Sequence, residues 1–481
     1  MNCRLAGLVL LIIVAPRAGA QPPPLTPTKL TLYPAAAPTP ALKYKLLPEE
    51  LDRTPGNGAL LYYRAYSPEW WGFVSRNQTG DFYDKLDQEL HMPLNELAGQ
   101  TGNTNPLIWV QSTKMLDDVD QAARREYVEW EMAERVRQEG IMLLLPDVQG
   151  FRTVANLLGL RARFELARGQ YDKAAYTFQT GLALGRDVGK QPILISSLVG
   201  IAIATLQLEQ VETWIQTPHG PNLYWALTDL PRPMIDLRVP LQGEKLFLYA
   251  TFPEMKDIER AHLNSQQMQE RLEKWTQLLE GMSSSGSSQS LGGGKLVLLV
   301  QVIKTYPKAR RFLIAEGRKA EEVDALPALQ VVLIYSLRQY RRLQDDMYKW
   351  FNLPFWESRP GLVQAKKELA AARNNLEEGI PLASMLLPAV DRVRFASVRL
   401  DRLIAALRIV EAIRLYAAGH EGKLPSTLHD ITEVPIPQDP VTGKDFDYKV
   451  TGDHANLYGP PPSGESADSA NTVNYELTLA R

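Results

Sequence analysis

Apolar residues recur at intervals of three and four across residues 154–215, on both sides of a glycine-containing turn. They are Leu157, Leu158, Ala162 and Leu166 before the turn, and Ala174, Phe178 and Leu182 after it. This spacing is typical of two amphipathic helices that face each other across a short connection. Gly169 suits the left-handed position that ends a helix. A third apolar helix is predicted over residues 192–215, with Pro192 in its first turn.

Helical periodicity continues along most of the remaining chain. We predict helices over residues 113–144, 223–230, 234–249, 253–281 and 295–350, separated by proline-marked breaks at 218–221, 231–233 and 354–360. The clearest helix covers residues 382–418, where apolar side chains alternate by four and three positions in the manner of a helix-packing seam. Its arginines, among them Arg394, Arg402 and Arg408, are expected mostly on the other faces of that helix.

The first twenty residues have the composition of an export signal. Arg4 precedes an apolar run over residues 5–14, and Ala18-Gly19-Ala20 offers a small-residue cleavage site, so residues 1–20 are predicted to be a signal peptide. The chain has a single cysteine, Cys3, inside this segment. We therefore expect a periplasmic or extracellular mature protein that has no disulfide and no cysteine-bound metal.

Composition divides the rest of the chain. Proline-rich residues 21–45 are expected to form an extended, mobile leader, and the Ser/Gly-rich residues 283–294 a flexible linker. Between them, residues 46–282 form a repeat-like helical domain that starts with aromatic residues such as Trp70 and Trp71. A helical segment follows over residues 295–380, and a C-terminal unit over residues 381–481. The predicted fold class is mainly α, an antiparallel array of helical hairpins with a small C-terminal α+β domain.

Charge and hydropathy limit the partners. Lys plus Arg total 53 and Asp plus Glu total 55, which gives a net charge of −2. Such balance argues against nucleic acid or an anionic membrane as a partner held by bulk electrostatics. After the signal peptide, the longest apolar run, residues 193–206, contains Ser196 and Ser197. We therefore expect no integral membrane span in the mature chain.

Sequence motifs for catalysis are missing. The chain contains no Gly-x-Ser-x-Gly elbow, His-Glu-x-x-His zinc helix, P-loop or dinucleotide fingerprint. Glu259 and His262 form one Glu-x-x-His, which we interpret as a surface pairing because di-iron bundles need two such pairs. Asp117, Asp118 and Asp120 are interpreted as a solvated face, since near-adjacent residues of a helix point in different directions. No catalytic residue, metal site or cofactor is predicted.

The central turn resembles the second half of a tetratricopeptide repeat. Gly169, Tyr171, Ala174, Phe178 and a small residue at Gly181 follow the spacing of that family. The resemblance covers about one repeat. It implies that small residues let two helices approach closely while aromatic residues fill the gap. Arg161 and Glu165 stand where the family prefers a large apolar and an aromatic residue. A protein-binding surface is therefore predicted at Arg161, Glu165, Tyr171 and Phe178, with a helical hairpin that only builds core as the alternative.

The C-terminal unit resembles the periplasmic part of the major pseudopilins of type II secretion. A long helix is followed by Leu424-Pro425, by Asp439-Pro440 with Gly443, and by the strand-like residues Phe446 and Tyr448. The resemblance implies a turn at Asp439 and a small antiparallel sheet that continues from Tyr458 to Leu479. The chain departs from that family by lacking its apolar N-terminal helix. In some pseudopilins acidic residues hold calcium, but Glu465 and Asp468 provide too few oxygen ligands for such a site.

A signal peptide, a repeat-like body and this C-terminal unit together resemble exported proteins of planctomycete-type bacteria, a resemblance that supplies no activity. We predict a non-catalytic exported helical protein that mediates protein–protein interaction with envelope or secreted proteins. One alternative is a component or relative of a type II secretion or pilus-like apparatus. Another is an envelope hydrolase, which would require a pocket with at least two facing carboxylates.

Overall fold

The computed structural model describes residues 26–66, 81–99, 106, 114–140, 146–264, 266–271, 273–274, 294–374, 379, 382–383, 387 and 390–480. The predicted signal peptide, Trp70, Trp71 and residues 283–293 of the predicted linker lie outside these residues. The described part is mainly helical and has a small sheet built largely from its C-terminal residues, which confirms the fold class in outline.

The helices of the N-terminal half are α1 (Gly58–Ala65), α3 (Asp81–His91), α4 (Leu94–Ala98), α6 (Met115–Ala123), α7 (Met132–Glu139), α8 (Pro146–Ala167), α9 (Tyr171–Gly189), α10 (Leu194–Ile215), α11 (Tyr224–Thr228) and α12 (Arg238–Thr251). The later helices are α14 (Gly294–Ala315), α15 (Ala320–Asp324), α16 (Ala328–Tyr348), α17 (Phe355–Asn374) and α19 (Val390–Gly419). Short 3₁₀ helices are η1 (Glu50–Asp52), η3 (Pro253–Met255), η4 (Lys349–Asn352) and η5 (Leu428–Asp430). The strands are β1 (Thr28–Leu32), β2 (Thr54–Asn57), β3 (Arg125–Tyr127), β4 (Asp447–Thr451), β5 (His454–Gly459) and β6 (Val473–Leu479).

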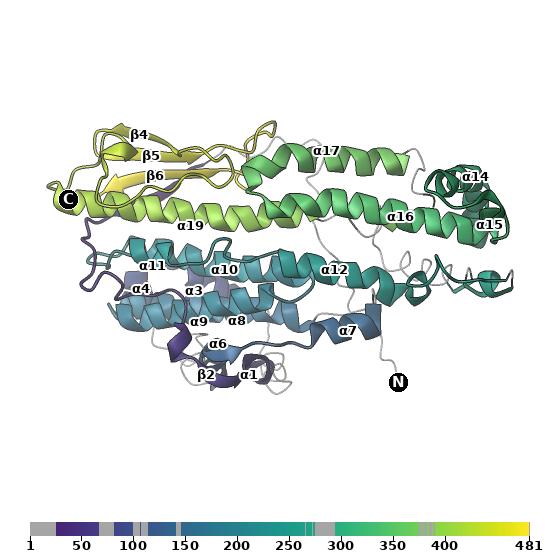
Figure 1. The fold of residues 1–481 in the computed structure, drawn as a ribbon. Coiled ribbons are helices and arrows are strands. Elements are labelled where there is room, and N and C mark those ends of the chain that lie inside the picture. Colours follow the sequence, from purple (N-terminus) through teal and green to yellow (C-terminus); the bar gives the residue numbers. More distant parts are fainter. Residues whose placement is uncertain are drawn as a thin grey trace.

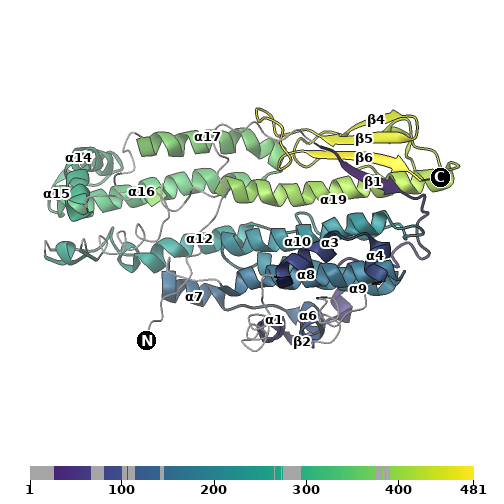
Figure 2. The same cartoon turned by 180° about the vertical axis from the view of Figure 1, so that it is seen from behind.

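The helices form two elongated layers. In Figure 1 the lower layer contains α7 to α12, and the upper layer contains α14 to α19 with the sheet at one end. Helix α19 packs on α10 and α11, so the main core lies between the layers and includes Trp214 and Ile404. A second apolar cluster, with Tyr62 and Phe151, lies where α3 and α4 pack on α8 and where α6, covered by α1, packs on α9. The reverse view in Figure 2 shows the same two layers.

Helices α8, α9 and α10 form a three-helix bundle in which each helix contacts the other two. Gly169 lies in the turn between α8 and α9 and has a φ of +68°, in the left-handed region that was predicted for the end of the first helix. Glycines let α9 and α10 approach closely, because a Cβ on Gly200 would lie 2.4 Å from the carbonyl oxygen of Gly185. The predicted hairpin is confirmed.

Several predicted helix boundaries are wrong. The helix predicted over residues 253–281 starts as η3 and is followed by turns and irregular chain up to residue 264, and the one predicted over residues 295–350 is divided into α14, α15 and α16. The helix predicted over residues 113–144 is interrupted, because β3 separates α6 from α7 and pairs in parallel with β2. The break predicted at residues 354–360 is shorter, since α17 begins at Phe355 and contains Pro360. Pro360 is the sixth residue of α17, so the helix lacks the one hydrogen bond that an N–H at this position would donate to the Trp356 carbonyl.

The main sheet has the order β1-β6-β5-β4. The hairpin β4–β5 and the pair β5–β6 are antiparallel, as predicted for this region, whereas β1 pairs in parallel with β6 over Thr28–Leu32 and Tyr475–Leu479. Leu30 and Leu32 of β1 are buried. The prediction of a mobile leader over residues 21–45 is therefore wrong for this stretch, which is an edge strand of the C-terminal sheet.

Buried arginines on α19 contradict the predicted distribution of charge along that helix. Arg402, Arg408 and Arg414 are at most 6% exposed. Arg402 forms an ion pair of 2.7 Å with Asp439, and Arg414 one of 2.8 Å with Glu411. These cations join α19 to surrounding loops through hydrogen bonds that an apolar side chain does not provide.

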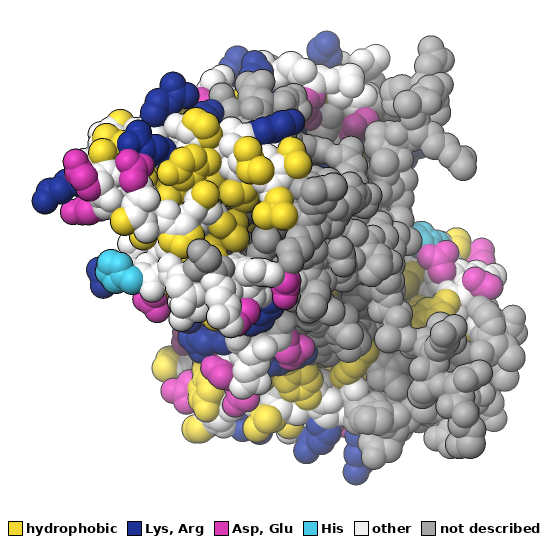
Figure 3. All heavy atoms as spheres, turned by 90° about the vertical axis from the view of Figure 1, so that its right-hand side faces the viewer, with side chains coloured by type: hydrophobic (Ala, Val, Ile, Leu, Met, Phe, Trp, Pro, Cys, Tyr) yellow, Lys and Arg dark blue, Asp and Glu magenta, His cyan; other side chains and the backbone are white. Residues whose placement is uncertain are grey.

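Two apolar surfaces have different surroundings. Within the described part, α10 is the one helix long and apolar enough to cross a membrane, and most of it is buried inside the protein. From the sequence we expect no apolar run of spanning length, because the longest uninterrupted run covers only residues 193–206. The whole helix Leu194–Ile215 nevertheless reaches that length. On α14, by contrast, Leu299, Val300 and Ile303 are exposed, and Figure 3 shows apolar side chains gathered on the end of the molecule that bears α14 and α15.

Glu212 of α10 links the bundle to the sheet and makes stability depend on pH. Burial raises the pKa of Glu212 to about 7, although the Tyr475 hydroxyl donates a hydrogen bond to it. The native state therefore binds more protons than the unfolded chain between about pH 4.5 and 7, so stability decreases as pH rises through that window. We expect the free energy of unfolding of the wild type to decrease by about 2–3 kcal/mol between pH 5 and 8 because of Glu212. Glu212→Gln should lack this decrease.

Urea unfolding of the wild type and the variant at each pH measures this difference. Glu357→Gln, at an exposed position of α17, is the matched control and should follow the wild type. Equal pH slopes for Glu212→Gln and the wild type would contradict the assignment.

Candidate functional site

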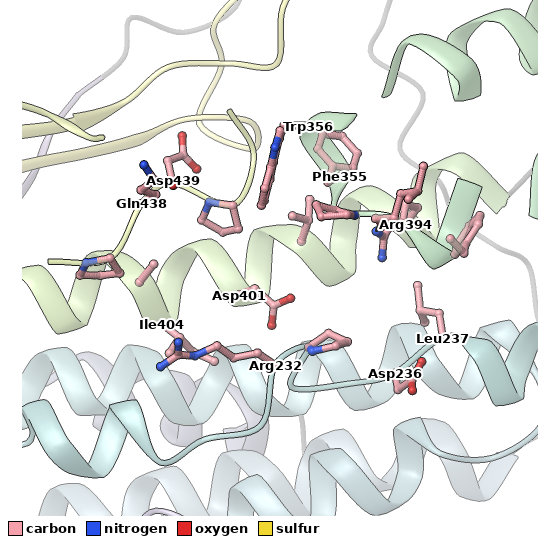
Figure 4. Close-up of a pocket in the computed structure, with 18 of the residues that line it drawn as sticks. Arg232, Asp236, Leu237, Phe355, Trp356, Arg394, Asp401, Ile404, Gln438 and Asp439 are labelled. Atoms are coloured by element: carbon pink, nitrogen blue, oxygen red, sulfur yellow. Dashed lines mark hydrogen bonds between the residues drawn. The ribbon is translucent and has the colours of Figure 1, made fainter. Parts of the chain in front are cut away.

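A cavity of about 720 Å³ opens at the seam between the two layers. We call it the α19 groove. Its floor is one face of α19, and its walls come from residues 232–238, 351–356 and 435–440. Figure 4 shows Trp356 and Asp439 on one side of α19, Arg232 and Asp236 on the other, and Asp401 between them. Ligand pockets often occur at such junctions between structural units.

The floor is a single stripe of α19. Arg394, Val398, Asp401, Ala405 and Arg408 follow one another at intervals of four, three, four and three residues, which places them on one face. At about 1.5 Å of rise per residue, the stripe is roughly 21 Å long. It carries a cation at each end and a carboxylate in the middle.

Proline-rich loops form the walls. Pro233, Pro354, Pro435, Pro437 and Pro440 all line the groove, and each restricts the backbone at its position. Trp356 is 41% exposed at the rim, while Phe355 beside it is buried. Such walls lose little conformational entropy when a ligand enters.

Asp401 has an unusual environment. Its Oδ1 atom accepts a hydrogen bond of 2.9 Å from the Met234 backbone N–H. Burial raises the pKa of Asp401 to about 6, against the opposing effects of that hydrogen bond and of Arg394 and Arg232. Its other oxygen accepts no hydrogen bond from the described residues.

The arginines at the two ends have neutral partners. Arg408 donates from Nε to Thr228 Oγ1 at 2.9 Å and from Nη2 to the Tyr224 hydroxyl at 3.2 Å. Arg394 donates from Nη2 to the Leu353 carbonyl at 2.6 Å, and its buried Nε has no hydrogen-bond partner among the described residues. Burial lowers the pKa of both guanidinium groups, which marks an environment where a bound anion would be stabilised.

The remaining carboxylates of the groove are paired. Asp439 binds Arg402 and accepts from the Val441 N–H at 2.9 Å, and Asp236 pairs with Arg238. Asp401 is thus the one carboxylate of the groove without an ion pair among the described residues. The groove thus contains one carboxylate outside an ion pair, Asp401, and two, Asp236 and Asp439, that are held by arginines.

The predicted binding residues on α8 and α9 have hydrogen-bond or packing partners within the protein. Arg161 forms two hydrogen bonds to Asp120, of 2.7 and 2.9 Å, and Thr177 donates to Glu165 at 2.7 Å. Burial raises the pKa of Glu165. Asp120 is 9% exposed, so its prediction as part of a solvated face is wrong.

The two aromatic residues of the prediction also have partners within the protein. Tyr171 donates its hydroxyl to the Pro218 carbonyl at 3.1 Å, and Phe178 is fully buried near the ring of Trp214. The structure therefore gives Arg161, Glu165, Tyr171 and Phe178 a role in packing α8, α9 and α10. They do not form one open surface.

Other predicted features have structural partners. Glu259 forms ion pairs with Arg338 at 2.7 Å and Arg341 at 3.3 Å. Glu465 pairs with Arg359 at 2.8 Å, and Asp468 accepts from the backbone N–H of Asn471. The part of the chain that the structure describes has no group of three or more His, Cys, Asp and Glu side chains placed to hold a metal ion.

Sequence reasoning did not identify the groove. The available signal was the spacing of Arg394, Asp401 and Arg408, which places charged residues on the same stripe as Val398 and Ala405. The chain matches no protein-family model, no curated protein and no solved structure, so the geometry of the groove carries the functional conclusion.

Proposed function

We propose that this protein is a non-catalytic, exported binding protein of the cell envelope, and that it holds a segment of a partner protein in the α19 groove. The observation that carries the proposal is the preformed groove at the seam of two helical layers. The proposed activity is still the predicted protein–protein interaction, but the binding surface is now placed on α19 and not on α8 and α9.

The composition of the groove supports a polypeptide ligand. It combines aromatic rings, arginines and an exposed tryptophan, which are the residue types that dominate binding energy in protein interfaces. Its floor, roughly 21 Å long, matches about six residues of extended chain at ~3.3 Å each. A partner segment would therefore lie along α19 and contact both walls.

Filling the groove tests this proposal. Ala405 is a small residue of the floor, so we expect Ala405→Trp to occupy the space that the partner segment needs. Cross-linked affinity purification of the tagged protein from its native envelope, read by mass spectrometry, should recover at least tenfold less partner with this variant.

The matched control is Ala315→Trp at an exposed position near the end of α14. It makes the same change in size away from the groove and should leave partner recovery unchanged. Thermal unfolding of both variants checks that they are folded. Equal recovery with wild type and with folded Ala405→Trp would contradict the proposal.

A relation to secretion pseudopilins is a second proposal. The order of a long helix, an Asp439 turn and antiparallel strands supports it, and Gly443 takes the left-handed conformation (φ +68°) that this turn requires. A strain that lacks the protein should then lose export of secreted substrates. Unchanged export would contradict this relation and leave the groove proposal standing.

A further inference from the structure

We infer that the α19 groove selects an acidic polypeptide segment, and that Arg408 and Arg394 bind its carboxylates near the two ends of the groove. This inference rests on the proposed function and names the chemistry of the partner. It predicts acidic residues near both ends of the bound segment and a neutral or basic residue between them.

The first support is the unpaired charge of Arg408. Its side chain is only 6% exposed, and no carboxylate of the described residues forms an ion pair with it. Arg402 and Arg414, which are buried on the same helix, each have a carboxylate within 2.8 Å. A buried cation normally has a charged partner, because removal from water destabilises an isolated charge. The counter-ion of Arg408 would come from the ligand.

The neutral partners of Arg408 are satisfied without it. Thr228 Oγ1 donates to the Tyr224 carbonyl at 2.7 Å, and the Tyr224 hydroxyl donates to the Pro435 carbonyl. Both hydroxyls only accept from Arg408. The guanidinium is thus not needed to satisfy these hydroxyl donors, and a ligand carboxylate can bind it without breaking the bonds that they donate.

The second support comes from the other end of the floor. Arg394 has a buried Nε with no hydrogen-bond partner among the described residues and no ion pair with a described carboxylate. Arg232 is exposed at the wall, and among the described residues its side chain hydrogen-bonds to the Thr228 carbonyl alone, at 3.1 Å. These three arginines outnumber Asp401, the one unpaired carboxylate of the groove among the described residues. The surplus of positive charge favours an anionic ligand.

The spacing along α19 sets the pattern of charge. Arg394 and Arg408 are fourteen residues apart with Asp401 midway, so the charges follow one another at intervals of about 10 Å of helix. A small anion cannot reach both arginines. An extended segment can, when two acidic residues lie about six positions apart. Asp401 disfavours a third acidic residue between them, because like charges repel in a groove of low dielectric constant.

Selection from a library of random octapeptides displayed on phage tests the inference, with the purified mature protein as bait. We expect the selected peptides to be enriched in pairs of Asp or Glu near opposite ends. A selected peptide, labelled with fluorescein, should bind at least tenfold more weakly to Arg408→Gln and to Arg394→Gln in fluorescence anisotropy.

Two controls separate the possible results. Arg392→Gln removes the same charge from an exposed position of α19 outside the groove and should bind like the wild type. Thermal unfolding shows whether each variant is folded. Peptides that bind in the groove, as shown by their loss with Ala405→Trp, but that carry no acidic enrichment overturn the inference and leave the proposed function intact. Peptides that bind Ala405→Trp as well as the wild type overturn both.

Discussion

Replacement of Arg414 by methionine is expected to reduce the free energy of unfolding by about 3–5 kcal/mol, because it leaves a buried carboxylate without its partner. Arg414 is fully buried and donates two hydrogen bonds to Glu411, of 2.8 and 2.9 Å. It also donates to the carbonyl oxygens of Gly220 at 2.6 Å and Tyr33 at 2.9 Å. One side chain thus joins α19 to the α10–α11 connection and to the segment after β1.

Urea unfolding followed by circular dichroism measures this loss. Burial raises the pKa of Glu411, and Arg414 opposes that shift. When the arginine is removed, the unpaired carboxylate of Glu411 is therefore the main destabilising group. The double variant Glu411→Gln/Arg414→Met should therefore recover part of the stability. The control Arg392→Met changes an exposed arginine of the same helix and should stay within about 0.5 kcal/mol of the wild type. A loss below about 1 kcal/mol for Arg414→Met would contradict the expected coupling.

The second large effect is expected for Trp214→Ala, which should destabilise the protein by about 3–5 kcal/mol. Trp214 is fully buried where α9, α10 and the segment after β1 meet, and its ring centroid lies 5.5 Å from that of Tyr44 and 5.1 Å from that of Tyr171. Its Nε1 donates to the Pro221 carbonyl at 2.9 Å. Truncation leaves a cavity among rigid rings and an unsatisfied carbonyl group.

Thermal and urea unfolding measure the effect of Trp214→Ala. Tyr127→Ala, at a side chain that is 53% exposed, is the control and should cost no more than about 1 kcal/mol. A stability close to that of the wild type would contradict this prediction, because it would mean that the surrounding rings move to fill the cavity. We do not expect such a movement, since the rings belong to three separate segments packed around Trp214.

Local patterns in the sequence were sufficient to predict the helical hairpin, and the resemblance to pseudopilins implied the C-terminal turn. The hairpin depends on residues three and four apart and on Gly169, all of which are neighbours in the sequence. The turn depends on Asp439, which accepts from the backbone N–H of Gly443 at 2.8 Å and uses its side chain to bind the Val441 N–H. Such interactions within a few residues leave a readable signal.

Long-range partners explain the errors. Thr28–Leu32 reads as a proline-flanked leader, and only its pairing with Tyr475–Leu479 makes it a strand. Arg402 and Arg408 look like solvent-facing residues until Asp439 and Thr228 come into contact with them. The α19 groove could not be predicted for the same reason. It forms where three separate loops come together beside one stripe of α19, and the sequence of that stripe shows only a mixture of charged and apolar residues.

The parallel pairing of β1 with β6 also sets an order of events during synthesis. The ribosome makes β1 early, whereas Val473–Leu479 follow roughly 440 residues later, about 20–90 s at ~5–20 residues per second. The backbone hydrogen bonds of helices such as α8 and α9 are local, so these helices can form long before that time. Until then, Leu30 and Leu32 belong to an unpaired, apolar segment. Such segments are prone to aggregate, and chaperones protect them. A nascent chain that stalls before β6 cannot cover these residues, so premature termination would leave a lasting signal for quality control.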